Sequence, residues 1–137
     1  MNKIVLNRSY GGFELSAKAA SEYLKLAFPN KKFYAYSTED YQEYFRINLD
    51  TYKGDRFYIT STNQGAITNH IKDEFIIYNI QRHDKNLVKV VELLGDNASG
   101  NYANLQVISI PDNKYYITEY DGFESVLTPS TINWNEL

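Results

Sequence analysis

The pattern of apolar and polar positions divides the chain into short strand-like runs and two helix-like stretches. Runs rich in β-branched and aromatic residues, bounded by glycine, proline, asparagine or aspartate, are typical of strands. The most continuous of them, FIIYNI at Phe75–Ile80, predicts a buried strand. The other predicted strands are Lys3–Asn7, Lys32–Ser37, Arg56–Thr60, Leu105–Ile110 and the two arms of a hairpin within Tyr115–Leu127.

Two stretches repeat their apolar residues with the spacing of an amphipathic helix. The first follows Ser16, a favourable N-cap, and stops at Pro29-Asn30. The second follows Asp84, another N-cap, and covers Lys85–Leu94 until Gly95 ends it. Their inner faces are predicted to contain Ala20, Tyr23, Leu24, Ala27 and Phe28 in the first helix, and Leu87, Val88, Val91 and Leu94 in the second.

The strongest local signal is Asp121-Gly122 between two β-prone runs, which predicts a two-residue hairpin turn of type I′. Because loop length fixes the register, the expected cross-strand pairs follow directly. Glu119 faces Glu124, a pair of like charges that costs stability unless a cation or water neutralises it. The other pairs are Tyr120 with Phe123, Thr118 with Ser125, Ile117 with Val126 and Tyr116 with Leu127.

Three further segments carry weaker signals. Thr38–Asp50 fits a helical turn or a strand, and we predict irregular structure there. Ala66–Asp73 is predicted to be a short helix, and Trp134 to cap the core. Together the elements predict a single α+β domain over residues 1–137, in which two helices pack on a mainly antiparallel sheet that contains the hairpin.

Composition excludes several classes of protein. The 137 residues include no cysteine, which excludes a disulfide framework, thiol catalysis and cysteine-based metal sites. The opening MNKIVLNRSYGG has too short an apolar run for a signal peptide, and no later run reaches the length of a membrane span. We therefore expect a cytoplasmic protein that does not contact membranes.

Charge and aromatic content narrow the range of partners. The net charge is −3, and the four arginines are spread along the chain, which argues against broad binding to a nucleic-acid backbone. A small anionic ligand needs only a local pocket. Thirteen tyrosines suit half-buried strands, and tyrosine is also enriched where protein surfaces meet.

The loop between the first strand and the first helix is a candidate anion site. Backbone N–H groups and the helix dipole favour anions at such a position. The glycine pair matches neither the dinucleotide nor the P-loop pattern, so a tight turn is the alternative interpretation. The candidate ligand-binding residues of this loop are Asn7, Arg8, Tyr10, Gly11 and Gly12.

Arg82 and His83 form a second candidate, because they lie between a predicted strand and a predicted helix. Histidine titrates near neutral pH, but His83 has no recognisable nucleophile or metal-ligand spacing around it. His70 is the only other histidine, and a dedicated metal site needs three or four ligands. We therefore expect neither a metal nor a cofactor.

Glu119 and Glu124 form the third candidate, together with the neighbouring Tyr120. Cross-strand pairing could place the carboxyl groups near the separation used by retaining glycosidases. Alternatively, the two glutamates are simply solvated at a hairpin tip, or Arg8 or Arg82 neutralises them. The last arrangement would join all three candidates into one polar cluster.

Three separated motifs resemble a family of small proteins common in bacteriophage and prophage genomes. They are NRSYGGFELS near the N-terminus, RHDKNLVKVVELLG, and the hairpin ITEYDGFE, followed by a late Trp134. Lys85 stands where the family often has proline at the first helical position. Residues 33–75 match nothing in the pattern. The resemblance implies a phage setting and assigns no chemistry.

Two functional hypotheses follow. The first is a non-enzymatic phage accessory protein that binds a host protein or a small anionic, nucleotide-like signalling molecule and thereby counters host defence. The second is a small hydrolase or transferase that uses the Glu119/Glu124 pair with His83. Either protein could act as a homo-oligomer.

Overall fold

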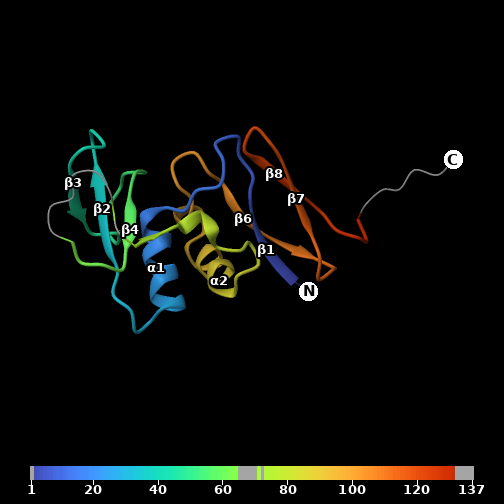
Figure 1. The fold of residues 1–137 in the computed structure, drawn as a ribbon. Helices are drawn as coiled ribbons and strands as arrows, with labels where there is room; N and C mark the ends of the chain where they lie inside the picture. The colour runs from blue at the N-terminus through green and yellow to red at the C-terminus, as the bar shows by residue number, and fades with distance from the viewer. Residues whose placement is uncertain (1, 65–70, 72, 132–137) are drawn as a thin grey trace.

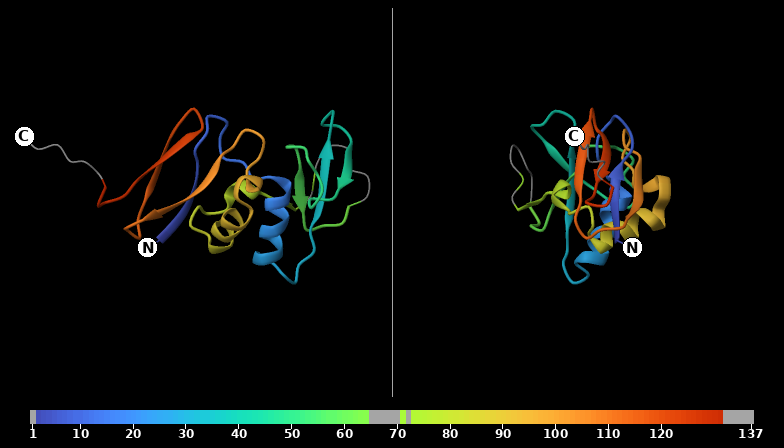
Figure 2. Two further views of the ribbon diagram at one scale, coloured as in Figure 1. Left: turned by 180° about the vertical axis from the view of Figure 1, so that it is seen from behind. Right: turned by 90° about the vertical axis from the view of Figure 1, so that its right-hand side faces the viewer.

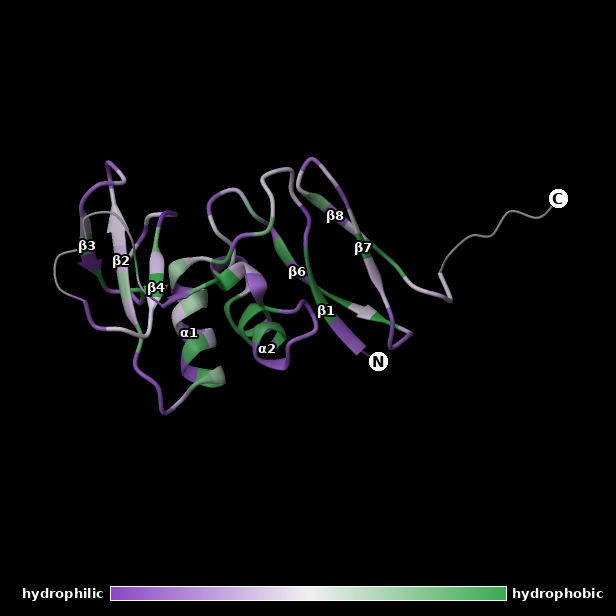
Figure 3. Ribbon diagram, in the orientation of Figure 1, coloured by the Kyte–Doolittle hydropathy of each residue, from purple (hydrophilic) through white to green (hydrophobic). Residues whose placement is uncertain are grey.

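Two helices lie side by side between two groups of strands in the computed structural model, which describes residues 2–64, 71 and 73–131 (Figures 1 and 2). A four-stranded sheet covers one side of the helices, and two two-stranded sheets cover the other. All strand pairs are antiparallel, which confirms the α+β prediction. Hydrophobic residues concentrate in the helices and the middle strands (Figure 3).

Strand β1 (Asn2–Asn7) pairs with β6 (Leu105–Ile110), and both strands lie where the sequence predicts them. This pair is a middle layer with both faces covered. Val5 packs into the core that contains the helices, whereas Ile4 and Leu6 pack against the hairpin. Burial on both faces explains why the apolar run of β1 is continuous rather than alternating.

The hairpin β7 (Tyr116–Tyr120) and β8 (Phe123–Leu127) has the predicted register at all five pairs. Asp121 and Gly122 have φ values of 52° and 91°. Positive φ at both central residues is the signature of a type I′ turn, so that prediction is confirmed.

Both helices begin and end where the sequence predicts. In α1 (Ala17–Ala27) the Ser16 hydroxyl accepts the N–H of Ala19, and in α2 (Lys85–Leu94) the Asp84 carboxylate accepts two N–H groups. Gly95 ends α2 with a φ of 58° and leads into the 3-10 turn η2 (Gly95–Ala98). Asp84 also accepts the Tyr23 hydroxyl at 3.0 Å, so the second helix cap is tied to the first helix.

The four-stranded sheet has the order β3 (Tyr44–Ile47), β2 (Tyr34–Thr38), β4 (Tyr58–Thr60) and β5 (Glu74–Phe75). The irregular structure predicted for Thr38–Asp50 is wrong, because this segment contains β3. Asp40 accepts the N–H groups of Gln42 and Glu43 and reverses the chain after β2, so that β3 pairs back onto it. Long-range pairing therefore overrides an ambiguous local pattern.

The buried strand predicted at Phe75–Ile80 is also wrong. Only Glu74 and Phe75 pair with β4, after which the chain forms a single 3-10 turn, η1 (Ile77–Asn79). The turn places Ile77 and Ile80 on the core side and leaves Tyr78 on the surface. Side chains three residues apart face the same side of a 3-10 turn. Ile77 and Ile80 therefore both reach the core, although the apolar run had predicted a strand.

The hairpin does not join the β1–β6 sheet, which corrects the prediction of one sheet that contains it. The edge of β1 that faces away from β6 already has other hydrogen-bond partners. The N–H of Val5 donates to the Arg82 carbonyl at 2.9 Å, and the N–H of Asn7 donates to the Glu124 carboxylate at 2.7 Å. These two bonds replace a backbone ladder, so the hairpin packs against β1 through side chains. The helix predicted at Ala66–Asp73 and the position of Trp134 lie wholly or largely outside the described residues.

Asp50 links α1 to the segment after β3, and we expect this link to weaken in acid. Hydrogen bonds from Ser21, Lys25 and Lys18 lower the pKa of Asp50 to about 2. A carboxyl with a lowered folded-state pKa stabilises the protein above its ordinary pKa, and this contribution is lost as the pH falls through the folded-state pKa. The stability lost on Asp50→Asn should therefore be largest near pH 6 and shrink between pH 4 and pH 2. Urea unfolding across this range measures it, and a difference that is constant with pH would contradict the account.

Candidate functional site

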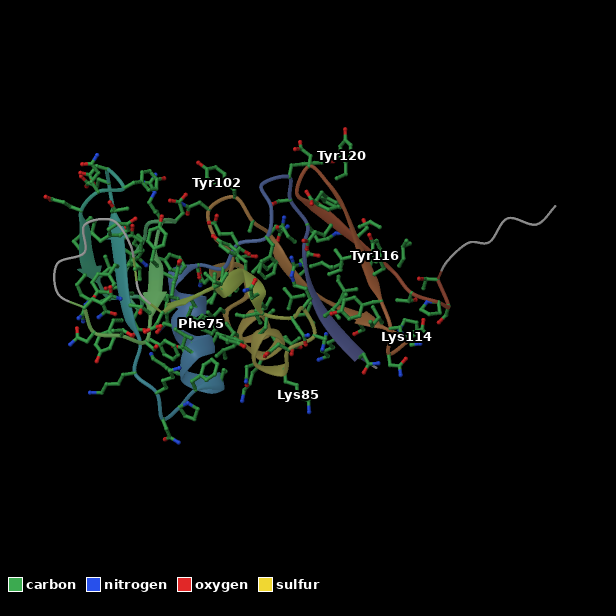
Figure 4. The ribbon with its side chains drawn as sticks, in the orientation of Figure 1. Phe75, Lys85, Tyr102, Lys114, Tyr116 and Tyr120 are labelled. Carbon is green, nitrogen blue, oxygen red and sulfur yellow. The ribbon has the colours of Figure 1, made fainter. Side chains whose placement is uncertain are left out.

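Three loops meet at one end of the β1–β6 pair, and we call them the three-loop tip. They are residues 8–13 after β1, residues 100–104 before β6, and the hairpin turn at residues 120–123. Tyr102 and Tyr120 mark the second and third loops in Figure 4 and lie at the same edge of the molecule. The first and third loops belong to two of the three motifs that carry the phage resemblance.

Asn7 is the hydrogen-bonding centre of the three-loop tip. Its side chain is fully buried, and Nδ2 donates to the carbonyls of Ser9 at 2.9 Å and Gly122 at 2.8 Å. Its Oδ1 accepts the N–H of Asn104 at 2.8 Å. One amide therefore joins all three loops, and buried hydrogen bonds of this kind fix a single arrangement.

Two glycines allow the loops to approach more closely than any other residue would. A Cβ atom on Gly11 would lie 2.0 Å from the Tyr102 carbonyl oxygen. A Cβ atom on Gly122 would lie 2.5 Å from the Gly12 nitrogen and 2.7 Å from the Tyr10 oxygen. Both glycines thus serve loop-to-loop packing, and for Gly11 this favours the tight-turn interpretation over an anion cradle.

A buried ion pair lies beneath the tip. Arg82 donates both Nη atoms to the two carboxylate oxygens of Glu124, the second at 2.9 Å, and the guanidinium stacks 3.7 Å from the centre of the Phe13 ring. The side chains are 20% and 8% exposed, respectively. Arg8 donates to the Glu124 carbonyl at 3.1 Å and lies over Phe123. Arg8, Arg82 and Glu124 therefore converge, which is one of the alternatives that the sequence left open.

Glu119 does not share this cluster, although it is the register partner of Glu124. Its carboxylate accepts the N–H of Gly122 at 2.7 Å at the surface, where it helps to close the turn. Glu124 is committed to Arg82 and Asn7. Because each carboxylate has its own structural donors, the geometry does not favour the glycosidase-like arrangement that the spacing suggested.

His83 faces away from the tip, although it directly follows Arg82. Its Nδ1 bonds the Tyr115 hydroxyl at 2.7 Å, at the opposite end of β1. Among the described residues, no group of three or more histidine, cysteine or acidic side chains could hold a metal ion. His83 therefore belongs to a different surface from the other candidate residues.

Three tyrosines project from the tip with their side chains in solvent: Tyr10 is 66% exposed, Tyr102 68% and Tyr120 78%. The Tyr10 ring packs 5.4 Å from that of Phe123. Sequence reasoning named Tyr10 and Tyr120 and missed Tyr102. The pairing of Asn7 with Leu105 brings the loop before β6 beside Asn7, so knowledge of that register would have found Tyr102.

Comparison of the chain with protein-family models, with curated proteins and with solved structures finds no match. The resemblance to a phage family therefore stays a prediction. Within the described ranges, no helix has both the length and the apolar character needed to cross a membrane.

Proposed function

We propose that this protein is a non-enzymatic phage accessory protein that binds a host protein through the three-loop tip. The observation that supports this most directly is the set of three exposed tyrosines, Tyr10, Tyr102 and Tyr120, held on loops that are hydrogen-bonded to one another. Tyrosine offers a large contact area and loses little side-chain entropy on binding.

The residue types of the tip support a protein partner. Its loops read SYGG, GNYAN and YDGF. Tyrosine, serine, glycine and asparagine are the residues that antibody loops use for protein recognition, where tyrosine supplies contact area and the small polar residues supply adaptable hydrogen bonds. Because the loops are already fixed, binding would cost little ordering entropy.

Charge indicates the kind of surface that would dock. Asp121 and Glu119 are exposed beside Tyr120, and the faces of tyrosine rings attract cations. A host protein that presents arginine or lysine side chains would complement both features. In the phage setting that the resemblance implies, covering such a surface on a defence protein would block its action.

Photo-crosslinking followed by affinity measurement tests this proposal. A photo-reactive phenylalanine analogue is placed at position 102 and, as a control, at position 78 during expression in bacteria. Tyr78 is an apt control because it has the same 68% exposure and lies outside the tip. We expect one bacterial protein to be crosslinked from position 102 only.

The affinity of the purified partner is then measured for two alanine variants. It should bind Tyr102→Ala at least about tenfold more weakly than the unmodified protein, as for an aromatic hot spot, and should bind Tyr78→Ala as tightly as the unmodified protein. Equal effects of the two alanine variants would contradict the proposal.

A further inference from the structure

A groove of about 470 Å³ lies at the end of β1 opposite the three-loop tip. The start of β1, the end of β6 and the outer face of α2 form its walls. Lys85 marks this side of the molecule in Figure 4, at the opposite edge from Tyr102 and Tyr120. The volume is within the range of small-molecule sites.

The groove carries positive charge that the protein does not neutralise. Lys85 and Lys89 lie one turn apart on α2 and line it. The third lysine, Lys3, forms an ion pair with Glu92 at 2.9 Å. The Asp112 carboxylate also lines the groove and accepts hydrogen bonds from Ser130 but keeps its charge, so the lining side chains carry one net positive charge. Across the described ranges, Lys85 and Lys89 have no acidic partner, so they are available to an anion.

His83 and Tyr115 add polar and aromatic contacts beside these lysines. The Tyr115 hydroxyl bonds His83 Nδ1 at 2.7 Å, and the two rings meet edge to face with centroids 5.8 Å apart. Since Nδ1 is engaged, the ring orientation is fixed and Nε2 is the atom left for a ligand. Within the described residues, Nε2 has no hydrogen-bond partner.

The groove also has a small apolar wall beside polar side chains such as Asn2 and Asn113. Val88 and Ile110 form a fixed base, 8% and 3% exposed, and the half-buried Tyr115 ring supplies most of the apolar surface that a ligand could contact. An apolar wall with a few convergent polar groups at one end is the usual composition of a site for an organic ligand. A bare inorganic anion would leave that wall unused.

We propose that this groove binds a nucleotide. Lys85, Lys89 and His83 Nε2 contact the phosphates, and the base packs against Val88 and the Tyr115 ring. Lysine is a common phosphate ligand, and aromatic side chains stack on bases whatever their identity. The proposal does not depend on the three-loop tip, since the groove shares none of the residues that contact a partner there.

Amide NMR titrations test the proposal with ADP, GDP and 3′,5′-cyclic AMP as probes. Inorganic phosphate and adenosine, titrated separately, report on the two halves of the site. We expect at least one nucleotide to shift the amides of residues 83–89 and 115 and to bind more tightly than phosphate or adenosine.

A pair of double variants tests the role of the lysines. Lys85→Ala/Lys89→Ala should bind that nucleotide at least tenfold more weakly than the unmodified protein. Lys31→Ala/Lys53→Ala removes the same charge elsewhere and should keep the affinity within twofold. Both variants should retain the melting temperature, since all four lysines are exposed.

Three results would overturn the assignment. The first is that none of the nucleotides moves the groove amides at millimolar concentration. The second is equal binding of the nucleotide by the two double variants, which would indicate nonspecific charge attraction. The third is phosphate binding as tightly as the nucleotides, which would mean that the apolar wall contributes nothing. Normal partner binding in Lys85→Ala/Lys89→Ala would separate this site from the tip.

Discussion

Replacing Arg82 with methionine is expected to lower the free energy of unfolding by about 3–5 kcal/mol, the usual cost of removing one partner of a buried ion pair. Methionine keeps an apolar stem of similar length but removes the guanidinium, and with it both the ion pair and the contact over the Phe13 ring. The Glu124 carboxylate, which is 8% exposed, would then be buried with only the Asn7 N–H and no cation. Urea unfolding at neutral pH measures the loss.

Lys3→Met is the matched control for this prediction. Lys3 forms an ion pair of similar distance with Glu92, but both side chains are 47% exposed. Exposed pairs contribute about 0–1 kcal/mol because solvent screens them. Similar losses in the two methionine variants would show that burial of the Arg82–Glu124 pair does not have the energetic role described here.

Gly122→Ala is expected to destabilise the protein by roughly 3 kcal/mol, the sum of a positive-φ penalty and local overpacking. Gly122 has a φ of 91°, and the added Cβ would meet backbone atoms of Gly12 and Tyr10 rather than a side chain that can rotate away. The two loops would have to separate. Thermal and urea unfolding should show the effect together with disturbed NMR signals across the tip.

Gly95→Ala separates the two contributions. Gly95 also has positive φ, but an added Cβ would meet no atom within 4 Å. Only the backbone penalty applies there, on the order of 1–3 kcal/mol, because a φ of 58° with a ψ of −129° is a conformation that residues other than glycine rarely adopt. Should Gly95→Ala prove as damaging as Gly122→Ala, close packing of the hairpin against the first loop would not be what stabilises the tip.

The elements that the sequence predicted well are those whose signals are local. Asp121-Gly122 fixes the hairpin register, and Ser16 and Asp84 cap their helices, through contacts within a few residues. The errors at β3 and at Phe75–Ile80 arise where pairing with distant strands decides the structure. The local sequence pattern carries no information about which distant strands will pair.

The candidate site was predicted only in part. The sequence offered the convergence of Arg8, Arg82 and Glu124 as one alternative among several, and the strand expected to lead into Arg82 does not form. The sequence could not indicate that the Glu124 carboxylate would be buried while that of Glu119 stays at the surface. It also could not show that His83 would face the groove instead of the tip.

Amide hydrogen exchange of the free protein tests the central claim, which is that the three-loop tip is rigid before any partner binds. The N–H of Asn104, bonded to the Asn7 side chain, and the N–H of Asn7, bonded to Glu124, are the two reporters. We expect both to exchange as slowly as the amides of the β1–β6 ladder and to become fast in Asn7→Ala and Glu124→Ala, respectively. Exchange of both reporters in the unmodified protein at the rate of an exposed loop such as Lys53-Gly54 would contradict the account.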